Sequence, residues 1–327
     1  MGSGRGRFFV LAAWIAMAVS LSAAAGAWAQ AYPTKPIRLV VGFPPGGGND
    51  ITSRLLAAKM QETWGQPVVV DNKPGANSII AAEFVAKSAP DGYTLLVNGT
   101  GGMSINPVLY AKLPYDPRVD FVPITTIGVF AMAFAIHPSI LVNTLQEFIA
   151  YARAHPGKLS YGSAVSTFQL AAEMFKQMTG TDIVQIPFKG SAPSLNALLA
   201  GDVQMSIDSI AALLPHIRSG RVKPLAVASA KRISSMPELP TMAEAGVPGY
   251  EISTWLGVFA PAGTARDIVS KLNVELVRIV RLPDVREKLM VLGAEPLGNT
   301  SEQTAEMIRG EIARYGPVVK RAGMKAD

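Results

Sequence analysis

Residues 37–50 read IRLVVGFPPGGGND, an apolar run followed by a glycine-rich turn. The run is typical of a buried strand, and apolar residues at helical spacing follow from Ile51 to Met60. Glycines let the main chain approach a ligand, and the first N–H groups of a helix have no internal partner, so they can donate to an anion. The alternative is a plain strand-to-helix turn with Asn49 or Asp50 as the helix N-cap.

Neither a triphosphate nor a dinucleotide site fits this turn. It lacks the Gly-Lys-Ser/Thr of a P-loop, which supplies a phosphate-binding lysine and a magnesium-binding hydroxyl. It also lacks the GxGxxG spacing of a dinucleotide-binding turn.

Along the rest of the chain, short β-branched runs alternate with longer amphipathic segments, a pattern that predicts parallel sheets covered by helices. The first set of strands is expected at 37–43, 68–70 and 94–97, with helices at 51–60 and 79–85. The second set has strands at 131–136, 159–162, 183–188, 203–207 and 224–228, and helices at 144–154, 168–178, 193–200 and 210–218. A strand at 252–260 precedes helices at 266–280, 285–292 and 301–322. We therefore expect an α/β fold with two lobes.

The composition excludes several functional classes. With 327 residues, 49% of them apolar and 17% charged, the chain is a folded globular protein. It has no cysteine, which excludes disulfides, zinc–thiolate sites, iron–sulfur clusters and a thiol nucleophile. Each of its three histidines adjoins a proline, and none has a second ligand at metal-binding spacing. We expect no metal and no cofactor.

The N-terminus predicts export. Arg5 and Arg7 precede an apolar run that ends near Ala25, and Ala27-Trp28-Ala29 matches a signal-peptidase site. Residues 1–29 are therefore interpreted as a signal peptide cleaved after Ala29, which places the mature protein in the periplasm; the alternative is an uncleaved membrane anchor. The formal charge of the whole chain is +6. Cleavage of the signal peptide would remove Arg5 and Arg7, and the basic residues that remain do not form a run. We therefore expect no nucleic-acid partner.

Loops of the second set carry further candidates for an anion site. Gly162 to Thr167 resembles the first turn, with hydroxyls in place of glycines before a helix, so two helix starts facing across a cleft would hold a carboxylate at each end. Alternatively, Ser166 or Thr167 is an ordinary N-cap. Asp208 follows a strand and can accept hydrogen bonds from a ligand hydroxyl or amine, or cap the next helix. Lys189 either attracts an acidic ligand or is a solvated surface lysine.

Ten sequence blocks occur in an order and spacing that resemble one family across about 290 residues. They are YPTKPIRLVV (32–41), FPPGGG with Asp50 (43–48), GQPVVV (65–70), NKPGA (72–76), APDGYTLL (89–96), NPVLY (106–110), LPYDP (113–117), FKGSAP (188–193), PTMAEAG (240–246) and APAGT (260–264). The chain resembles the extracytoplasmic solute receptors of tripartite tricarboxylate transporters, also called Bug-type receptors.

The resemblance implies a type II periplasmic-binding-protein fold with the ligand cleft between two lobes. Lobe 1 would comprise residues 30–131 and 253–327, and lobe 2 residues 132–252. The implied ligand is a small carboxylate, held by main-chain amides and ordered water. The positions that match the family's binding loops are Phe43, Gly47, Gly48, Asp50, Thr100, Ser163, Ser166, Thr167, Phe188, Lys189 and Asp208.

The implied function is capture of the carboxylate by a monomer and its delivery to the membrane subunits of a transporter, without catalysis. One alternative is a ligand sensor for a signalling partner. Another is an exported hydrolase or isomerase, for which Ser163 or Ser166 with Asp208 would be the candidates, although no histidine is well placed as a base.

Three positions depart from the family pattern and generate a prediction on specificity. Gly42 stands where proline is common, Gln169 where a histidine often begins the helix, and Phe188 where tyrosine is usual. Losing the tyrosine hydroxyl and the histidine removes two potential polar contacts, which favours a ligand whose distal part is apolar or aromatic. Phe188→Tyr is therefore expected to weaken binding of an aromatic acid relative to an aliphatic diacid, measured by calorimetric titration. An unchanged preference would contradict the hypothesis.

Overall fold

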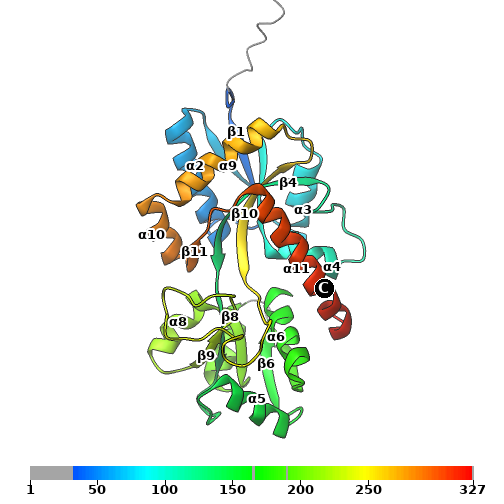
Figure 1. Cartoon of the computed structure of the whole chain (residues 1–327), viewed down its shortest axis with the longest axis vertical. Helices are drawn as coiled ribbons and strands as arrows, with labels where there is room; N and C mark the ends of the chain where they lie inside the picture. Colours follow the sequence, from blue (N-terminus) through cyan, green and yellow to red (C-terminus); the bar gives the residue numbers. More distant parts are fainter. Residues whose placement is uncertain (1–31, 164–165, 189–190, 326–327) are drawn as a thin grey trace, which may run out of the picture.

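The computed structural model describes residues 32–163, 166–188 and 191–325. Two β-sheets, one above the other in Figure 1, form two α/β lobes with helices on their faces. The six-stranded sheet has the order β11-β4-β10-β3-β1-β2, and the five-stranded sheet has the order β7-β6-β8-β5-β9. The prediction of a two-lobed α/β fold is confirmed.

The first lobe combines segments from both ends of the chain. Its strands are β1 (Ile37–Val41), β2 (Val68–Asn72), β3 (Thr94–Gly99), β4 (Phe121–Phe130), β10 (Thr254–Pro261) and β11 (Ala294–Pro296). Its helical segments are α2 (Gly48–Trp64), η1 (Ala76–Ser78), α3 (Ile79–Ala86), η2 (Gly101–Ile105), α4 (Asn106–Leu109), α9 (Arg266–Val280), α10 (Pro283–Val291) and α11 (Ser301–Ala322). β1 is parallel to β2 and β3, whereas β10 runs antiparallel to β3 and β4.

The second lobe comes from the middle of the chain. Its strands are β5 (Met132–Ile136), β6 (Leu159–Ser163), β7 (Ile183–Pro187), β8 (Met205–Ser209) and β9 (Lys223–Val227). Its helices are α5 (Leu145–Ala154), α6 (Ser166–Thr179), α7 (Ser191–Ala200) and α8 (Ile210–Arg218). β6, β7 and β8 are parallel, and β5 is antiparallel to β8.

The chain crosses between the lobes at two short segments. Ala131 alone separates β4 from β5, and residues 252–253 lead into β10. The two crossovers lie side by side at the middle of the molecule, because Thr254 pairs with Phe130, and the crossing strands are visible in Figure 1.

Helix α11 forms a third connection. Its Ile308 lies in a core cluster of the first lobe, whereas Tyr315 and Val319 lie in the cluster that fills the second lobe. The amide of Gln177 in α6 donates a hydrogen bond of 3.1 Å to the carbonyl of Val318. The C-terminal segment expected in lobe 1 thus packs against both lobes.

Most expected elements match the observed ones within a few residues, but the ten-residue strand β4 was not predicted. Its sequence contains Pro123, the buried pair Thr125 and Thr126, and Gly128, which interrupt the apolar run that marked the other strands. Burial inside a large sheet overrides these weak local preferences.

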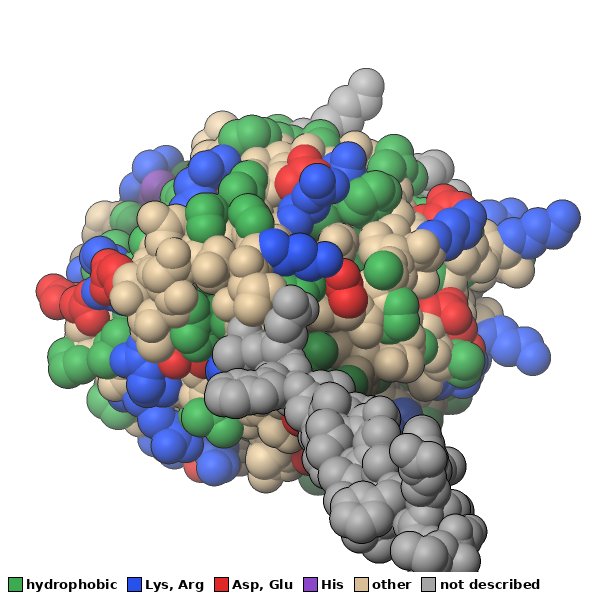
Figure 2. All heavy atoms as spheres, turned by 90° about the horizontal axis from the view of Figure 1, so that it is seen from above, with side chains coloured by type: hydrophobic (Ala, Val, Ile, Leu, Met, Phe, Trp, Pro, Cys, Tyr) green, Lys and Arg blue, Asp and Glu red, His purple; other side chains and the backbone are tan. Residues whose placement is uncertain are grey.

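The surface of the first lobe is mixed in charge. Figure 2 shows Lys and Arg side chains scattered among acidic and apolar ones on the described part of this face, rather than gathered in one basic patch. Among residues 32–325 as described, no helix is long and apolar enough to cross a membrane. The expected signal peptide, residues 1–29, lies outside the described residues.

The close approach of β3 to β10 generates a stability prediction. A Cβ at Gly99 would lie 2.0 Å from the carbonyl oxygen of Trp255, so Gly99→Ala must displace one strand. We expect a loss of about 1–3 kcal/mol or more in unfolding free energy. Gly310→Ala is the control, because nothing lies within 4 Å of its Cβ position in α11, and it should gain roughly 0.5–1 kcal/mol. Urea denaturation measures both, and equal effects would contradict the packing argument.

Candidate functional site

The carboxyl ends of the parallel strands in both lobes point toward the crossover segments. In the first lobe, Gly99 at the end of β3 pairs with Leu256, just after the crossover into β10, and β1 runs parallel to β3. In the second lobe, Ser209 at the end of β8 pairs with Met132, just after the crossover at Ala131, and β6 and β7 run parallel to β8. The loops that follow β1, β3, β6, β7 and β8 therefore lie at the sheet ends that face the crossovers, the usual position of ligands in α/β sheets.

The glycine-rich turn after β1 places the start of α2 at one of these sheet ends. Gly47 is the N-cap in extended conformation, without a side-chain cap in the described structure, and Gly47 and Gly48 are exposed. The interpretation of Asn49 or Asp50 as N-cap is wrong, because both already lie in the first turn of α2. The free N–H groups of this turn are available to an anion.

Asp50 holds the turn in place instead of facing a ligand freely. Its buried carboxylate accepts hydrogen bonds of 2.9 Å from the Gly46 N–H and from the Arg54 guanidinium. The Arg54 hydrogen bond outweighs burial and lowers the pKa of Asp50 to about 2. The carboxylate is thus neutralised by Arg54 at physiological pH, so a second anion at the helix start does not meet an uncompensated charge.

Arg54 and Asn72, which are not among the predicted site residues, complete this network. Asn72, at the end of β2, donates a hydrogen bond of 3.0 Å to the carbonyl of Phe43 and accepts one of 3.3 Å from Arg54. The place of Asn72 at the end of a strand could have indicated its role, because this strand is parallel to β1 and both strands end at the same sheet edge. Phe43 itself is half-buried and packs against the first-lobe core.

Thr100 directly follows β3, and its side chain is hydrogen-bonded to the crossover that leads into β10. Its buried hydroxyl accepts a hydrogen bond of 2.9 Å from the N–H of Trp255 and contacts the carbonyl of Ser253 at 3.3 Å. The expected ligand contact of Thr100 can therefore come only from its backbone or from a remaining lone pair.

In the second lobe, Ser163 is the end of a chain of polar side chains. Gln169 in α6 donates a 3.0 Å hydrogen bond to Gln185, and Gln185 donates one of 2.7 Å to the Ser163 hydroxyl. Gln169, which replaces the family's histidine, thus orients the site through Gln185, a residue that sequence reasoning missed. Ser163 meets a glutamine amide here, not a histidine base.

Phe188 is half-buried and lies over Gly162. A Cβ on Gly162 would come within 3.2 Å of the Phe188 ring, and the Phe188 N–H donates a 2.8 Å hydrogen bond to the carbonyl of Ser163. The ring therefore forms an apolar wall beside Ser163 at the ends of β6 and β7.

The remaining candidates of this loop are only partly placed. Ser166 and Thr167 are the first two residues of α6, so both lie within the helix, and neither is its N-cap. Thr167 is buried and Ser166 is half-buried. Lys189 lies outside the described residues.

Asp208 is a buried carboxyl group at the end of β8, only 2% exposed. Its Oδ1 accepts a 2.6 Å hydrogen bond from the Ser209 N–H, and burial raises its pKa to about 6. The interpretation of Asp208 as a helix cap is wrong, because Ser209 is the N-cap of α8. An ionisable group kept at this cost next to a cleft is typical of a functional site.

Three buried polar atoms near the first-lobe loops have no hydrogen-bond partner within the described structure. They are Asp50 Oδ1, Ser78 Oγ and Asn98 Nδ2. Ser78 follows two other residues in left-handed conformation and fills the space that a side chain at Gly42 would need. Buried polar atoms of this kind are usually satisfied by water or a ligand.

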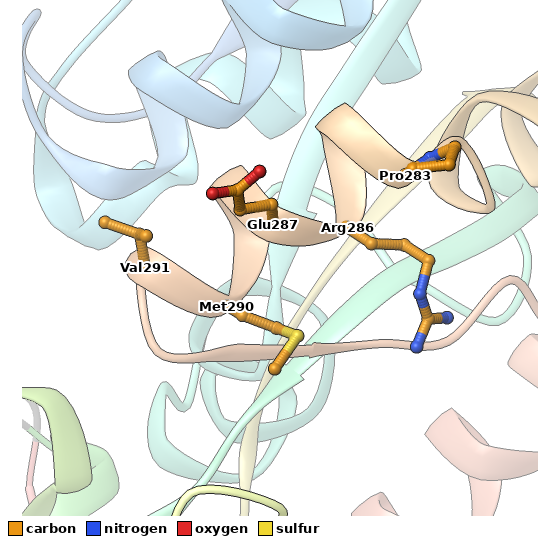
Figure 3. Close-up of a pocket in the computed structure, with 5 residues that line it drawn as sticks. All are labelled: Pro283, Arg286, Glu287, Met290 and Val291. Atoms are coloured by element: carbon orange, nitrogen blue, oxygen red, sulfur yellow. The ribbon is translucent and has the colours of Figure 1, made fainter.

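The hollow over α10 differs from this site, because it does not involve loops at the ends of strands. The hollow in Figure 3, of about 580 Å³, is lined by residues of the single helix α10, including the exposed Met290 and Val291. No group of three or more metal-ligating side chains occurs in the part of the chain that the structure describes.

Comparison with known proteins decides the family. Residues 52–324 match the model of the tripartite tricarboxylate transporter family receptor. The chain belongs to this receptor family. BugT of Bordetella pertussis is 37% identical over 320 residues, which are 97% of this chain and 96% of BugT.

Two solved structures of Rhodopseudomonas palustris proteins resemble this receptor. Rpa4515 with adipate is 40% identical with a TM-score of 0.75, covering 90% of this chain and 99% of Rpa4515. MatC with bound malate is 34% identical with a TM-score of 0.71, covering 88% of this chain and all (100%) of MatC. This family consists of solute receptors rather than enzymes, so the hydrolase alternative does not stand.

Burial of Asp208 generates a prediction about pH in the ligand-free receptor. Because its folded pKa is about 6 and the unfolded value is near 4, the folded state loses stability as pH rises between them. The loss is on the order of 3 kcal/mol and is absent below about pH 4. Asp208→Asn keeps the oxygen that accepts from Ser209 and should raise the melting temperature at pH 8 but not at pH 4. An equal rise in melting temperature at pH 4 and pH 8 would contradict the raised pKa of Asp208.

Proposed function

We propose that this receptor is exported to the periplasm, captures a small dicarboxylate between its lobes and delivers it to the membrane subunits of a tripartite transporter. The proposal is supported by the topology, which puts the starts of α2 and α6 at the sheet ends that face the crossovers. Each helix start attracts an anion. A ligand with a carboxylate at each end matches this arrangement.

Each half of the proposed site has its own task. Gly47 and Gly48 present main-chain donors to one carboxylate, with Asp50 positioning the turn. Ser163, Ser166 and Thr167 receive the other carboxylate, and Phe43 and Phe188 cover the apolar body. Asp208 and the backbone of Thr100 lie beside the ligand close to the crossovers, and Lys189 is retained as a proposed contact.

The energy required is modest. A dissociation constant of about 1 μM corresponds to about 8 kcal/mol. Each helix start contributes roughly 0.3–1 kcal/mol through its dipole, and up to about 2 kcal/mol when partly buried. Several charge-assisted hydrogen bonds of about 1.5–3 kcal/mol each and burial of the apolar body supply the rest, less the entropy of association.

Closure of lobe 1 (30–131 and 253–327) on lobe 2 (132–252) is proposed to trap the ligand, with the protein acting as a monomer. The short crossovers at Ala131 and 252–253 are suitable hinge positions, because a few residues can absorb such a rotation. Relatives crystallised with adipate and malate support a dicarboxylate ligand.

A pair of substitutions at Gly48 tests the proposal. Gly48 is the first residue of α2, where proline is tolerated, and Gly47 before it is already extended. Gly48→Pro removes one N–H donor, whereas Gly48→Ala keeps it and meets nothing within 4 Å. Adipate titrations by calorimetry should show weakening of about 10-fold or more for proline and about twofold or less for alanine.

The starting protein for these titrations is residues 30–327, unfolded and refolded to remove any retained ligand. Malate and succinate extend the panel, and dimethyl adipate is the uncharged control. Equal affinity of the proline and alanine variants would contradict a role for the α2 donors. Binding of dimethyl adipate as tight as that of adipate would contradict carboxylate recognition.

A further inference from the structure

A cavity lies between the lobes at the crossovers, and its lining residues differ from those of the proposed ligand cleft. Its volume is about 820 Å³, and it is bounded by Ala131 and Ser253 of the crossovers, the 229–237 loop of the second lobe, β11 and helix α11. We call it the rear cavity. Its size is in the range of small-molecule sites.

Sheet order places the rear cavity on the other side of the crossovers. Along the first sheet, β3 and β1 with the proposed cleft lie on one side of β10 and β4, whereas β11 lies on the opposite side. Along the second sheet, β6 and β7 lie on one side of β5, and β9, which leads into the 229–237 loop, lies on the other. In Figure 1 this loop, β11 and α11 surround the crossing strands β4 and β10.

The carboxylates that line the rear cavity already have partners. Glu311 accepts a 2.9 Å hydrogen bond from the indole N–H of Trp255, and Glu251 pairs with Arg314 at 3.5 Å. Glu295 accepts a 3.0 Å hydrogen bond from the Ser234 N–H and a further one from its hydroxyl.

Of the three cations that line it, Arg232 is paired with Glu244 at 2.9 Å, whereas Arg314 and Lys231 are more weakly engaged. The Nη1 of Arg314 lies 3.5 Å from Glu251, a long distance for an ion pair. Lys231 lines the cavity from the other lobe, and its ammonium makes no ion pair in the described parts of the chain. Arg314 and Lys231 therefore offer donors from the two lobes, which a ligand carboxylate would satisfy.

The walls between these groups are largely apolar. Val129, Ile233, Leu297 and Met307 line the cavity, and an organic anion with an apolar body would cover them. Burial of that body supplies affinity, and the donors fix its orientation.

We propose that the rear cavity is a second binding site, for a monocarboxylate with an apolar body, held by Arg314 from one lobe and Lys231 from the other. Because the two cations belong to different lobes, occupancy depends on the angle between the lobes. Closure that narrows the proposed cleft changes the rear cavity on the far side of the same crossovers. The two sites are therefore coupled, and the coupling is reciprocal.

Octanoate binding, followed by the fluorescence of Trp255, tests the proposal. Trp64 and Trp255 are the two tryptophans within residues 30–327, so a Trp64→Phe background isolates the indole that contacts Glu311. We expect a saturable change in emission below about 1 mM octanoate. Arg314→Gln should weaken octanoate binding about 10-fold. Arg309 is an exposed arginine of the same helix, and Arg309→Gln should leave octanoate binding unchanged.

A cavity-filling variant tests the rear site independently of whether Arg314→Gln folds. Gly310 lines the rear cavity with open space at its Cβ position, so Gly310→Leu should fold and abolish octanoate binding. No saturable signal up to about 10 mM, or undiminished binding by both the Arg314→Gln and Gly310→Leu variants, would overturn the proposal.

The Gly48→Pro variant separates the two sites. It should lose adipate affinity and keep octanoate affinity, and saturating adipate should shift octanoate affinity by a finite factor. Loss of octanoate binding in Gly48→Pro together with full competition by adipate would place octanoate in the proposed cleft and overturn the rear site. Failure of adipate to bind would instead count against the proposed transport function alone.

Discussion

The proposed site depends on backbone N–H groups at helix starts, which have no hydrogen-bond partner within their own helix. At the starts of α2 and α6 these groups have no helical partner, and parallel strands followed by helices force both starts to the same sheet edges. Because β10 and β5 return antiparallel beside β3 and β8, those edges meet at the crossovers. A gap with donors on both sides follows from the topology.

Main-chain donors recognise an anion well only if the loops that carry them are held firmly, and side chains do this in both lobes. Asp50, Arg54 and Asn72 hold the turn after β1, whereas Gln169 and Gln185 hold Ser163 after β6. Much of the charged and polar chemistry near the proposed site therefore stabilises its geometry. The proposed ligand contacts are therefore mainly glycines, hydroxyls and the aromatic rings of Phe43 and Phe188.

Sequence periodicity predicted most of this fold, because strands such as Ile37–Val41 are apolar throughout and helices such as Ser301–Ala322 are strongly amphipathic. It missed β4, where proline and threonines interrupt the pattern, and it did not show that α11 spans both lobes. The loops of the site were predictable from their places after strands. The partners Asn72 and Gln185 were not, because hydrogen bonds between distant segments leave no local pattern.

The most direct test of the account is a crystal structure of residues 30–327 with adipate. We expect one carboxylate within hydrogen-bond distance of the main-chain N–H groups at the start of α2. The other carboxylate should lie at Ser163 and the start of α6, with the lobes closed on both. A dicarboxylate bound outside this gap, or held there without contact to either helix start, would contradict the central claim.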